Sequence, residues 1–282
     1  MSLRATATFR LLILLVFVGI CPGFTFAADK VDPSTLDTGY RQMYNLEFSD
    51  AHRTFEAWKK MHPDDAMGPV SNAAAYLFAE FERLHVLESE LFTDNDRFEK
   101  RTKLTPDPAV RTAFEGELHR AYQIADRALA ASPDDSSALF AKIMVNGLRS
   151  DYAALVEKRN LAALSSAKDA RLLAEKLLSR DPSYYDAYLA VGIENYLLGL
   201  NSAPVRWLLR LGGAQTDKDE GIAKLRLTAE KGRYLAPYAR LLLAVAALRD
   251  HDRSQARALL SGLAEEFPQN ELYRRELGRL TP

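Results

Sequence analysis

The sequence predicts an all-α protein built from repeated helical hairpins, and three observations lead to this prediction. Ala and Leu together make up about 30% of the 282 residues, and both are strong helix formers. No segment shows the sustained alternation of apolar and polar residues that is typical of a half-buried strand. One spacing of small and apolar residues ahead of a proline recurs four times. We therefore expect one continuous helical-repeat domain.

The recurring unit is a small residue, a small or apolar residue four positions later, and a proline twelve positions after the first. A small residue lets two helices approach closely, and the residue one turn later lies on the same helix face. The proline stands just beyond the helix and ends it. The four copies are Ala51-Phe55-Pro63, Ala121-Ala125-Pro133, Ala170-Ala174-Pro182 and Ala256-Leu260-Pro268.

These copies resemble the tetratricopeptide repeat. The first copy matches best, because Gly39 and Phe48 join it at the family's spacing, whereas Lys158 stands where the third copy should have a small residue. The resemblance implies a right-handed superhelix of antiparallel helix hairpins, here irregular and with insertions. We expect hairpins over residues 36–61, 69–92, 108–132, 136–180 (with a break near Arg159), 184–200 and 238–267, an inter-helix turn at 45–48, and a loop at 93–108.

Residues 1–27 have the features of a signal peptide. Arg4 and Arg10 precede an apolar run of ten residues, which is shorter than the roughly 20 residues of a membrane-spanning helix. Small residues before position 28 suit a signal peptidase, so we predict cleavage after Ala27 and a single domain over residues 28–282. An N-terminal membrane anchor is the alternative, and the short apolar run disfavours it.

The composition indicates where the mature chain works and what it does not bind. Cys21 is the one cysteine and leaves with the signal peptide, so the mature chain forms no disulfide. Ile20 before it disfavours a lipid-modified cysteine. A mature chain without cysteine and without an Asn-x-Ser/Thr glycosylation acceptor favours a bacterial periplasmic or secreted protein. Losing Arg4 and Arg10 leaves 35 basic against 38 acidic residues, and a net charge of −3 argues against nucleic acid.

The segment from residue 195 to 222 is the least repeat-like part of the chain. Pro204 is predicted to begin a short apolar helix, containing Trp207, that ends at Gly212. We favour the interpretation that this helix packs inside the array, and the alternative is that it contacts a partner or a membrane surface.

Residues 184–248 resemble the eukaryotic tetratricopeptide-39 and inclusion-body-clearance proteins. The resemblance implies an all-helical repeat scaffold, and in those proteins a role connected with lipid droplets or aggregates. The predicted signal peptide departs from those intracellular proteins, so their roles are not carried over. The matching residues are Gly199, Ser202, Pro204, Gly212, Asp217 and Gly221.

The sequence lacks the residue constellations of an enzyme or a metal site. The five histidines show no metal-ligand spacing. Glu88-Ser89 lacks the Gly-Leu-Met-Gln that follows in lytic transglycosylases, and the Asp94-Asn95-Asp96 run lacks the glycine and distal glutamate of a calcium loop. We therefore expect no catalytic residue, no metal and no cofactor.

The remaining hypothesis is a binding scaffold. The first helix of each hairpin lines the concave face of a tetratricopeptide array, where peptides dock, so we expect a protein or peptide partner there, although some of these side chains could instead pack between helices. A small ligand, such as a glycan or a lipid in the superhelical cavity, is the alternative, and a cell-envelope enzyme is a third hypothesis that no constellation supports. The candidate partner-binding residues are Tyr40, Tyr44, Tyr188, Ile193, Tyr196, Tyr238, Arg249 and Trp207.

Overall fold

The structure is a computed structural model that describes residues 35–88, 104–200 and 215–280. Within these ranges the chain forms helices and no strand, so the all-α prediction is confirmed. The predicted signal peptide, most of the expected loop at 93–108, and the short helix expected around Trp207 lie outside the described residues.

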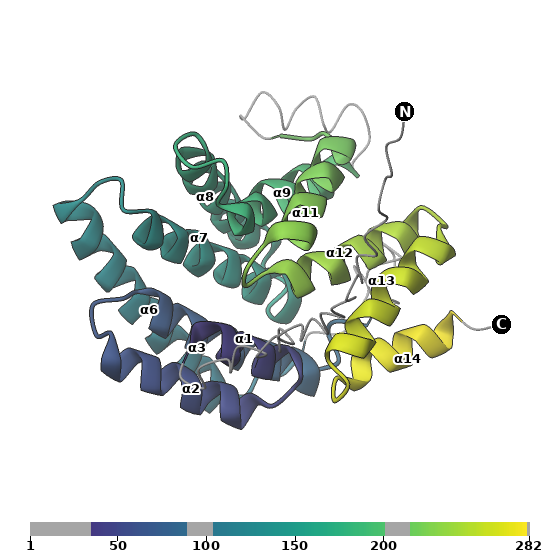
Figure 1. Cartoon of the computed structure of the whole chain (residues 1–282), viewed down its shortest axis with the longest axis horizontal. Coiled ribbons are helices and arrows are strands. Elements are labelled where there is room, and N and C mark those ends of the chain that lie inside the picture. The colour runs from purple at the N-terminus through teal and green to yellow at the C-terminus, as the bar shows by residue number, and fades with distance from the viewer. Residues whose placement is uncertain (1–34, 89–103, 201–214, 281–282) are drawn as a thin grey trace, which may run out of the picture. The chain divides into compact units, whose positions relative to one another are not determined.

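The helices pack as consecutive pairs along the chain (Figure 1). Within each pair the second helix returns along the first, and the second helix then packs against the first helix of the next pair. The pairs are α1 (Leu36–Tyr44) with α2 (Phe48–Met61), α3 (Met67–Arg83) with α6 (Pro108–Ala131), α7 (Ser136–Asp151) with α8 (Asn160–Leu178), α9 (Tyr188–Gly199) with α11 (Lys218–Lys231), and α12 (Ala236–Arg249) with α13 (Arg253–Glu266).

Three shorter elements complete the described chain. A π-helical turn, η1 (Tyr152–Val156), extends α7 at its C-terminal end, and a 3₁₀ turn, η2 (Tyr185–Ala187), leads into α9. The last helix, α14 (Glu271–Arg279), packs on α13. The predicted break near Arg159 is present, because η1 and Lys158, which has a φ of 58°, separate α7 from α8.

The recurring spacing falls on the second helix of four of the five pairs. Ala51, Ala121, Ala170 and Ala256 lie on α2, α6, α8 and α13, and each is at most 2% exposed. Each proline of the pattern follows the end of its helix within a few residues. The spacing therefore marks the positions where the second helix meets its neighbours, for the physical reason that predicted them.

Three of the six expected hairpins are single helices instead: the described part of 69–92 holds α3, and 184–200 holds η2 followed by α9. Residues 108–131 form one helix of 24 residues rather than a hairpin, and its partner is α3. The helices α11 and α14 lie outside the predicted hairpins. The helix α11 buries only Gly221, Leu225 and Thr228, and α14 is a short helix of nine residues that buries Leu272 and Tyr273. Helical spacing alone does not tell one long helix from two shorter ones.

The helices α9 and α11 approach each other closely at Gly221 and Gly199. A Cβ atom on Gly221 would lie 2.5 Å from the backbone nitrogen of Tyr196, and one on Gly199 would lie 2.7 Å from that of Lys218. Both distances are far below van der Waals contact, so a side chain at either position would push the helices apart. The Asp217 side chain caps α11 by accepting the backbone N–H groups of its first turn.

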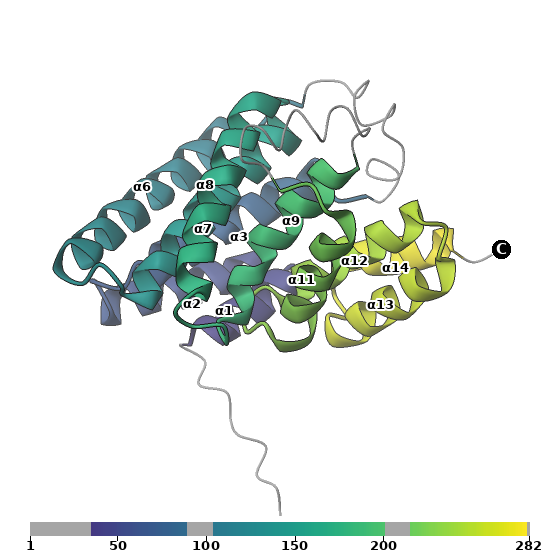
Figure 2. The same cartoon turned by 90° about the horizontal axis from the view of Figure 1, so that it is seen from above.

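The first pair also contacts the last helices, although an ideal repeat contacts only its neighbours in sequence. The Tyr44 hydroxyl donates to the Tyr234 carbonyl oxygen at 3.1 Å, and the Asn270 side-chain amide donates to the Tyr44 carbonyl oxygen at 2.8 Å. The Arg233 guanidinium forms two hydrogen bonds with Asp37. In Figures 1 and 2 the purple first pair accordingly lies beside the yellow α13 and α14.

Candidate functional site

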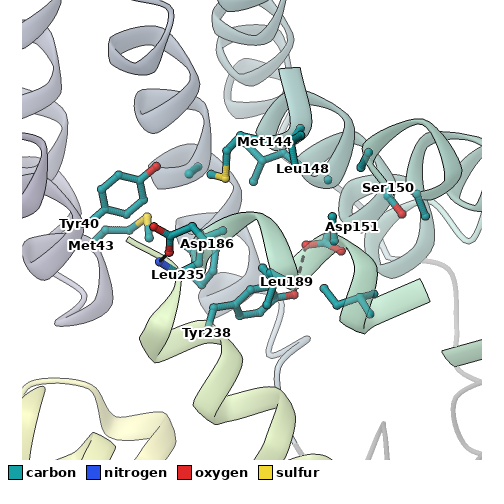
Figure 3. A pocket seen from close by; sticks show the side chains of 18 of the residues that line it. Tyr40, Met43, Met144, Leu148, Ser150, Asp151, Asp186, Leu189, Leu235 and Tyr238 are labelled. Atoms are coloured by element: carbon teal, nitrogen blue, oxygen red, sulfur yellow. Dashed lines mark hydrogen bonds between the residues drawn. The ribbon is translucent and has the colours of Figure 1, made fainter. Parts of the chain in front are cut away.

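Mainly the first helices of the pairs line a partly open cavity of about 70 Å³. Its wall is formed by side chains of α1, α3, α7, α8, α9 and α12, together with Asp186 of η2 and Leu235. Four of the eight predicted binding residues, Tyr40, Tyr44, Ile193 and Tyr238, lie on this wall. Figure 3 shows that Tyr40 and Met43 face the cavity from one side and Asp151 from the other.

Three tyrosines of the wall are locked in place by their neighbours. The Tyr40 ring stacks on Tyr234 with 4.8 Å between ring centroids, and its hydroxyl oxygen accepts a hydrogen bond from Ser71 at 3.1 Å. Tyr44 and Tyr238 both pack edge-on against Phe78, at 5.6 and 5.4 Å. All three tyrosines are at most 7% exposed. In this structure they therefore present little surface to a peptide.

The other predicted binding residues lie away from the cavity wall. Tyr196 is buried, its hydroxyl has no hydrogen-bond partner, and burial raises its pKa to about 12. Tyr188 is half-buried, and the Lys224 ammonium lies 5.3 Å from its ring centroid. Arg249 is half-buried at the end of α12. Trp207 lies outside the described residues.

Asp186 is a buried carboxylate that holds the start of α12. It is 4% exposed, and its oxygens accept the backbone N–H groups of Arg233, Tyr234 and Leu235 at 2.8–3.3 Å. These groups precede the first turn of α12, so Asp186 acts as a cap supplied by η2. Burial raises the pKa of Asp186, and the three N–H donors oppose that effect.

Asp151 is the other acid on the cavity wall, at the end of α7. It is half-buried, and its accessible surface borders the cavity. The Tyr238 hydroxyl donates to Asp151 Oδ2 at 3.2 Å (Figure 3). Among the described residues this is its single side-chain partner, and no Lys, Arg or His pairs with it. Burial raises the pKa of Asp151 to about 7, while the Tyr238 hydrogen bond opposes the shift.

Sequence reasoning missed both acids. Asp151 follows Met144, Gly147 and Leu148 at helical spacing, which places a carboxylate on the same face as residues of the cavity wall. That signal is weak, because an acid at the end of an apolar stripe is usually solvated. Asp186 has no local signal, since the N–H groups that it accepts belong to residues 47–49 positions later.

The described residues hold no group of three or more His, Cys, Asp or Glu side chains placed to bind a metal ion. None of the helices in the described ranges combines the length and apolarity needed to cross a bilayer. No protein-family model and no curated protein matches the chain.

Proposed function

We propose that this chain is an exported, non-enzymatic helical-repeat protein of the tetratricopeptide type, which binds a small molecule in the partly open cavity. The proposal includes export with cleavage after Ala27 and a right-handed superhelical arrangement of the pairs. The observation that carries it is the cavity itself. An apolar wall with a few convergent polar groups, one of which has a strongly shifted pKa, is the usual composition of a ligand site.

The size of the cavity limits the ligand. An apolar cavity of about 150 Å³ in another protein accommodates benzene, so a cavity of about 70 Å³ has room for about three to five non-hydrogen atoms. A whole glycan or lipid, which the sequence left as the alternative to a peptide partner, exceeds this volume. A small metabolite, or one short group of a larger molecule, fits it.

A glycine on the wall provides a direct test. A Cβ atom on Gly147 would meet no atom within 4 Å, and Gly147 borders the cavity, so the side chain of Gly147→Leu would occupy the ligand's space. Gly262→Leu is the matched control, because it also lies within a helix, has open space around its Cβ position and is away from the cavity wall. Far-UV circular dichroism checks that both variants fold.

Binding is measured by saturation-transfer NMR with three probes of similar size: 1-propanol, n-propylammonium and propionate. We expect at least one probe to bind the wild type and Gly262→Leu but not Gly147→Leu. The proposal fails if no probe binds, or if the folded Gly147→Leu variant binds as well as the wild type.

A protein or peptide partner is the second candidate function. The observation that favours it is that Tyr188 and Arg249 stay partly exposed. A photo-crosslinking amino acid at position 188, introduced in the native host, tests this candidate against the same substitution at the half-buried Tyr122 on α6. A defined adduct formed from position 188 alone is the expected result, and equal labelling from both positions would contradict it.

A further inference from the structure

We infer that the ligand of the cavity is a small organic cation, a primary alkylammonium ion of about the size of n-propylammonium. Asp151 binds its ammonium group, and the apolar wall surrounds its alkyl chain. This inference rests on the proposed function, because it names the class of ligand for the same cavity.

The half-buried Asp151 differs from the four fully buried acids of the described residues. Glu194 pairs with Arg171 at 2.9 Å, Glu80 pairs with Arg83 at 2.7 Å, and Glu276 pairs with Arg279 at 2.5 Å. Asp186 accepts three backbone N–H groups instead. Asp151 has one neutral hydroxyl donor. A half-buried carboxylate with so little compensation is less favourable when ionised, and a cation arriving in the cavity would supply the missing partner.

The rest of the wall favours a cation over an anion or a neutral polar molecule. No Lys, Arg or His of the described chain lines the cavity, so an anion would meet two carboxylates and no positive charge. The other titratable groups on the wall are already engaged: Tyr40 with Ser71, Tyr44 with the Tyr234 carbonyl, and Asp186 with its N–H donors. The Ser150 hydroxyl donates to the Ala163 carbonyl. Asp151 is thus the wall group with accepting capacity left.

The aromatic side chains of the wall suit the same ligand. Tyr44, Phe78 and Tyr238 border the cavity together with Asp151. Aromatic ring faces attract cations, and they do so more strongly where water is excluded. The methionine and leucine side chains that complete the wall accommodate an alkyl chain. One carboxylate that keeps accepting capacity, Asp151, in an apolar and aromatic wall therefore matches a molecule with one ammonium group and a short aliphatic tail.

Isothermal titration calorimetry of the purified chain at pH 8 tests the inference, with n-propylammonium, 1-propanol and propionate as probes. The first two have the same number of non-hydrogen atoms and differ in charge. We expect n-propylammonium to bind at least about tenfold more tightly than 1-propanol, because a charge-assisted hydrogen bond replaces a neutral one. Asp151→Asn should remove that preference, and Asp64→Asn, at an exposed acid, should retain it.

The pH dependence gives an independent measurement that needs no variant. The n-propylammonium ion stays charged between pH 5 and 8, whereas Asp151, with a pKa of about 7, takes up a proton as the pH falls. Affinity should drop about 10- to 100-fold from pH 8 to pH 5. At pH 6 binding should release a proton, which is detected as a binding heat that depends on the ionisation enthalpy of the buffer.

The outcomes separate this inference from the proposed function. If 1-propanol and n-propylammonium bind equally, with no effect of pH or of Asp151→Asn, the cavity binds small molecules but the cation inference is overturned. If no probe binds, both proposals fail. If Asp151→Asn does not fold, the pH profile and the proton release decide the question on the wild type.

Discussion

Two carboxylates border the same cavity, and their surroundings differ sharply. Asp186 is almost fully covered and accepts three backbone N–H groups at the start of α12, whereas Asp151 has one hydrogen bond, from the Tyr238 hydroxyl. Backbone N–H donors favour the ionised form of a carboxyl group, and burial without them favours the protonated form. Asp186 is therefore part of the framework that joins η2 to α12, while Asp151 keeps capacity for a partner from outside the chain.

The largest expected effect on stability comes from removing the Asp186 carboxylate. Asp186→Ala leaves the N–H groups of Tyr234 and Leu235 buried without an acceptor, and also removes the acceptor for Arg233. Because each orphaned buried donor costs about 1–3 kcal/mol, we expect the free energy of unfolding at pH 7.5 to fall by about 3–5 kcal/mol. Urea denaturation measures it. A loss below about 1 kcal/mol would show that Asp186 is not a structural cap.

A smaller effect follows from the raised pKa of Asp151. The folded state binds this proton up to a pH of about 7, whereas an unfolded Asp loses it near its ordinary value of 3.8. Between these values the folded state holds more protons than the unfolded state, so stability falls as the pH rises from about 4 and levels off above about 7. Because Asp151 is half-buried rather than fully covered, we expect a total of about 2–3 kcal/mol.

Urea unfolding of the wild type, Asp151→Asn and Asp64→Asn at pH 4.5, 6 and 8 checks this prediction. The loss of stability with rising pH should be smaller in Asp151→Asn than in the wild type, by about 2–3 kcal/mol. The pH profile of Asp64→Asn should follow that of the wild type. Parallel pH profiles for all three proteins would mean that Asp151 titrates normally.

The smallest effect concerns the single donor to Asp151. Tyr238→Phe removes the hydroxyl and keeps the ring that packs on Phe78. We expect a loss of about 1–2 kcal/mol at pH 8, where Asp151 is ionised, and about half of that at pH 5, where the acceptor is neutral. The same urea measurements at both pH values test this, and an identical loss at pH 5 and pH 8 would count against an ionised Asp151 at pH 8.

Much of the local structure could be predicted from the sequence. The small residues at Ala51, Ala121, Ala170 and Ala256 predicted where paired helices meet, and all four are buried on second helices. The same reasoning placed Tyr40, Tyr44 and Tyr238 on first helices, and the structure brings these three onto one cavity wall. These predictions succeeded because helix formation and hairpin packing depend on residues one or two turns apart.

The character of the site could not be predicted in the same way. The sequence suggested an open concave face for a peptide. In the structure Tyr40 stacks on Tyr234, the Tyr44 hydroxyl donates to the Tyr234 carbonyl, and both tyrosines are buried. Asp151 receives its hydrogen bond from a residue 87 positions away, and Asp186 accepts from residues 47–49 positions away. No local pattern contains pairings over such separations.

The sequence by itself determined that the chain is helical and where the small residues of four second helices pack, because both depend on contacts between neighbouring turns. Only the tertiary structure decided that the first pair meets the last helices, through contacts such as that of Asn270 with the Tyr44 carbonyl, 226 residues apart. This meeting covers Tyr40 and Tyr44, which local spacing marks as candidate binding residues, and places them on the wall of a pocket that Asp151 also borders.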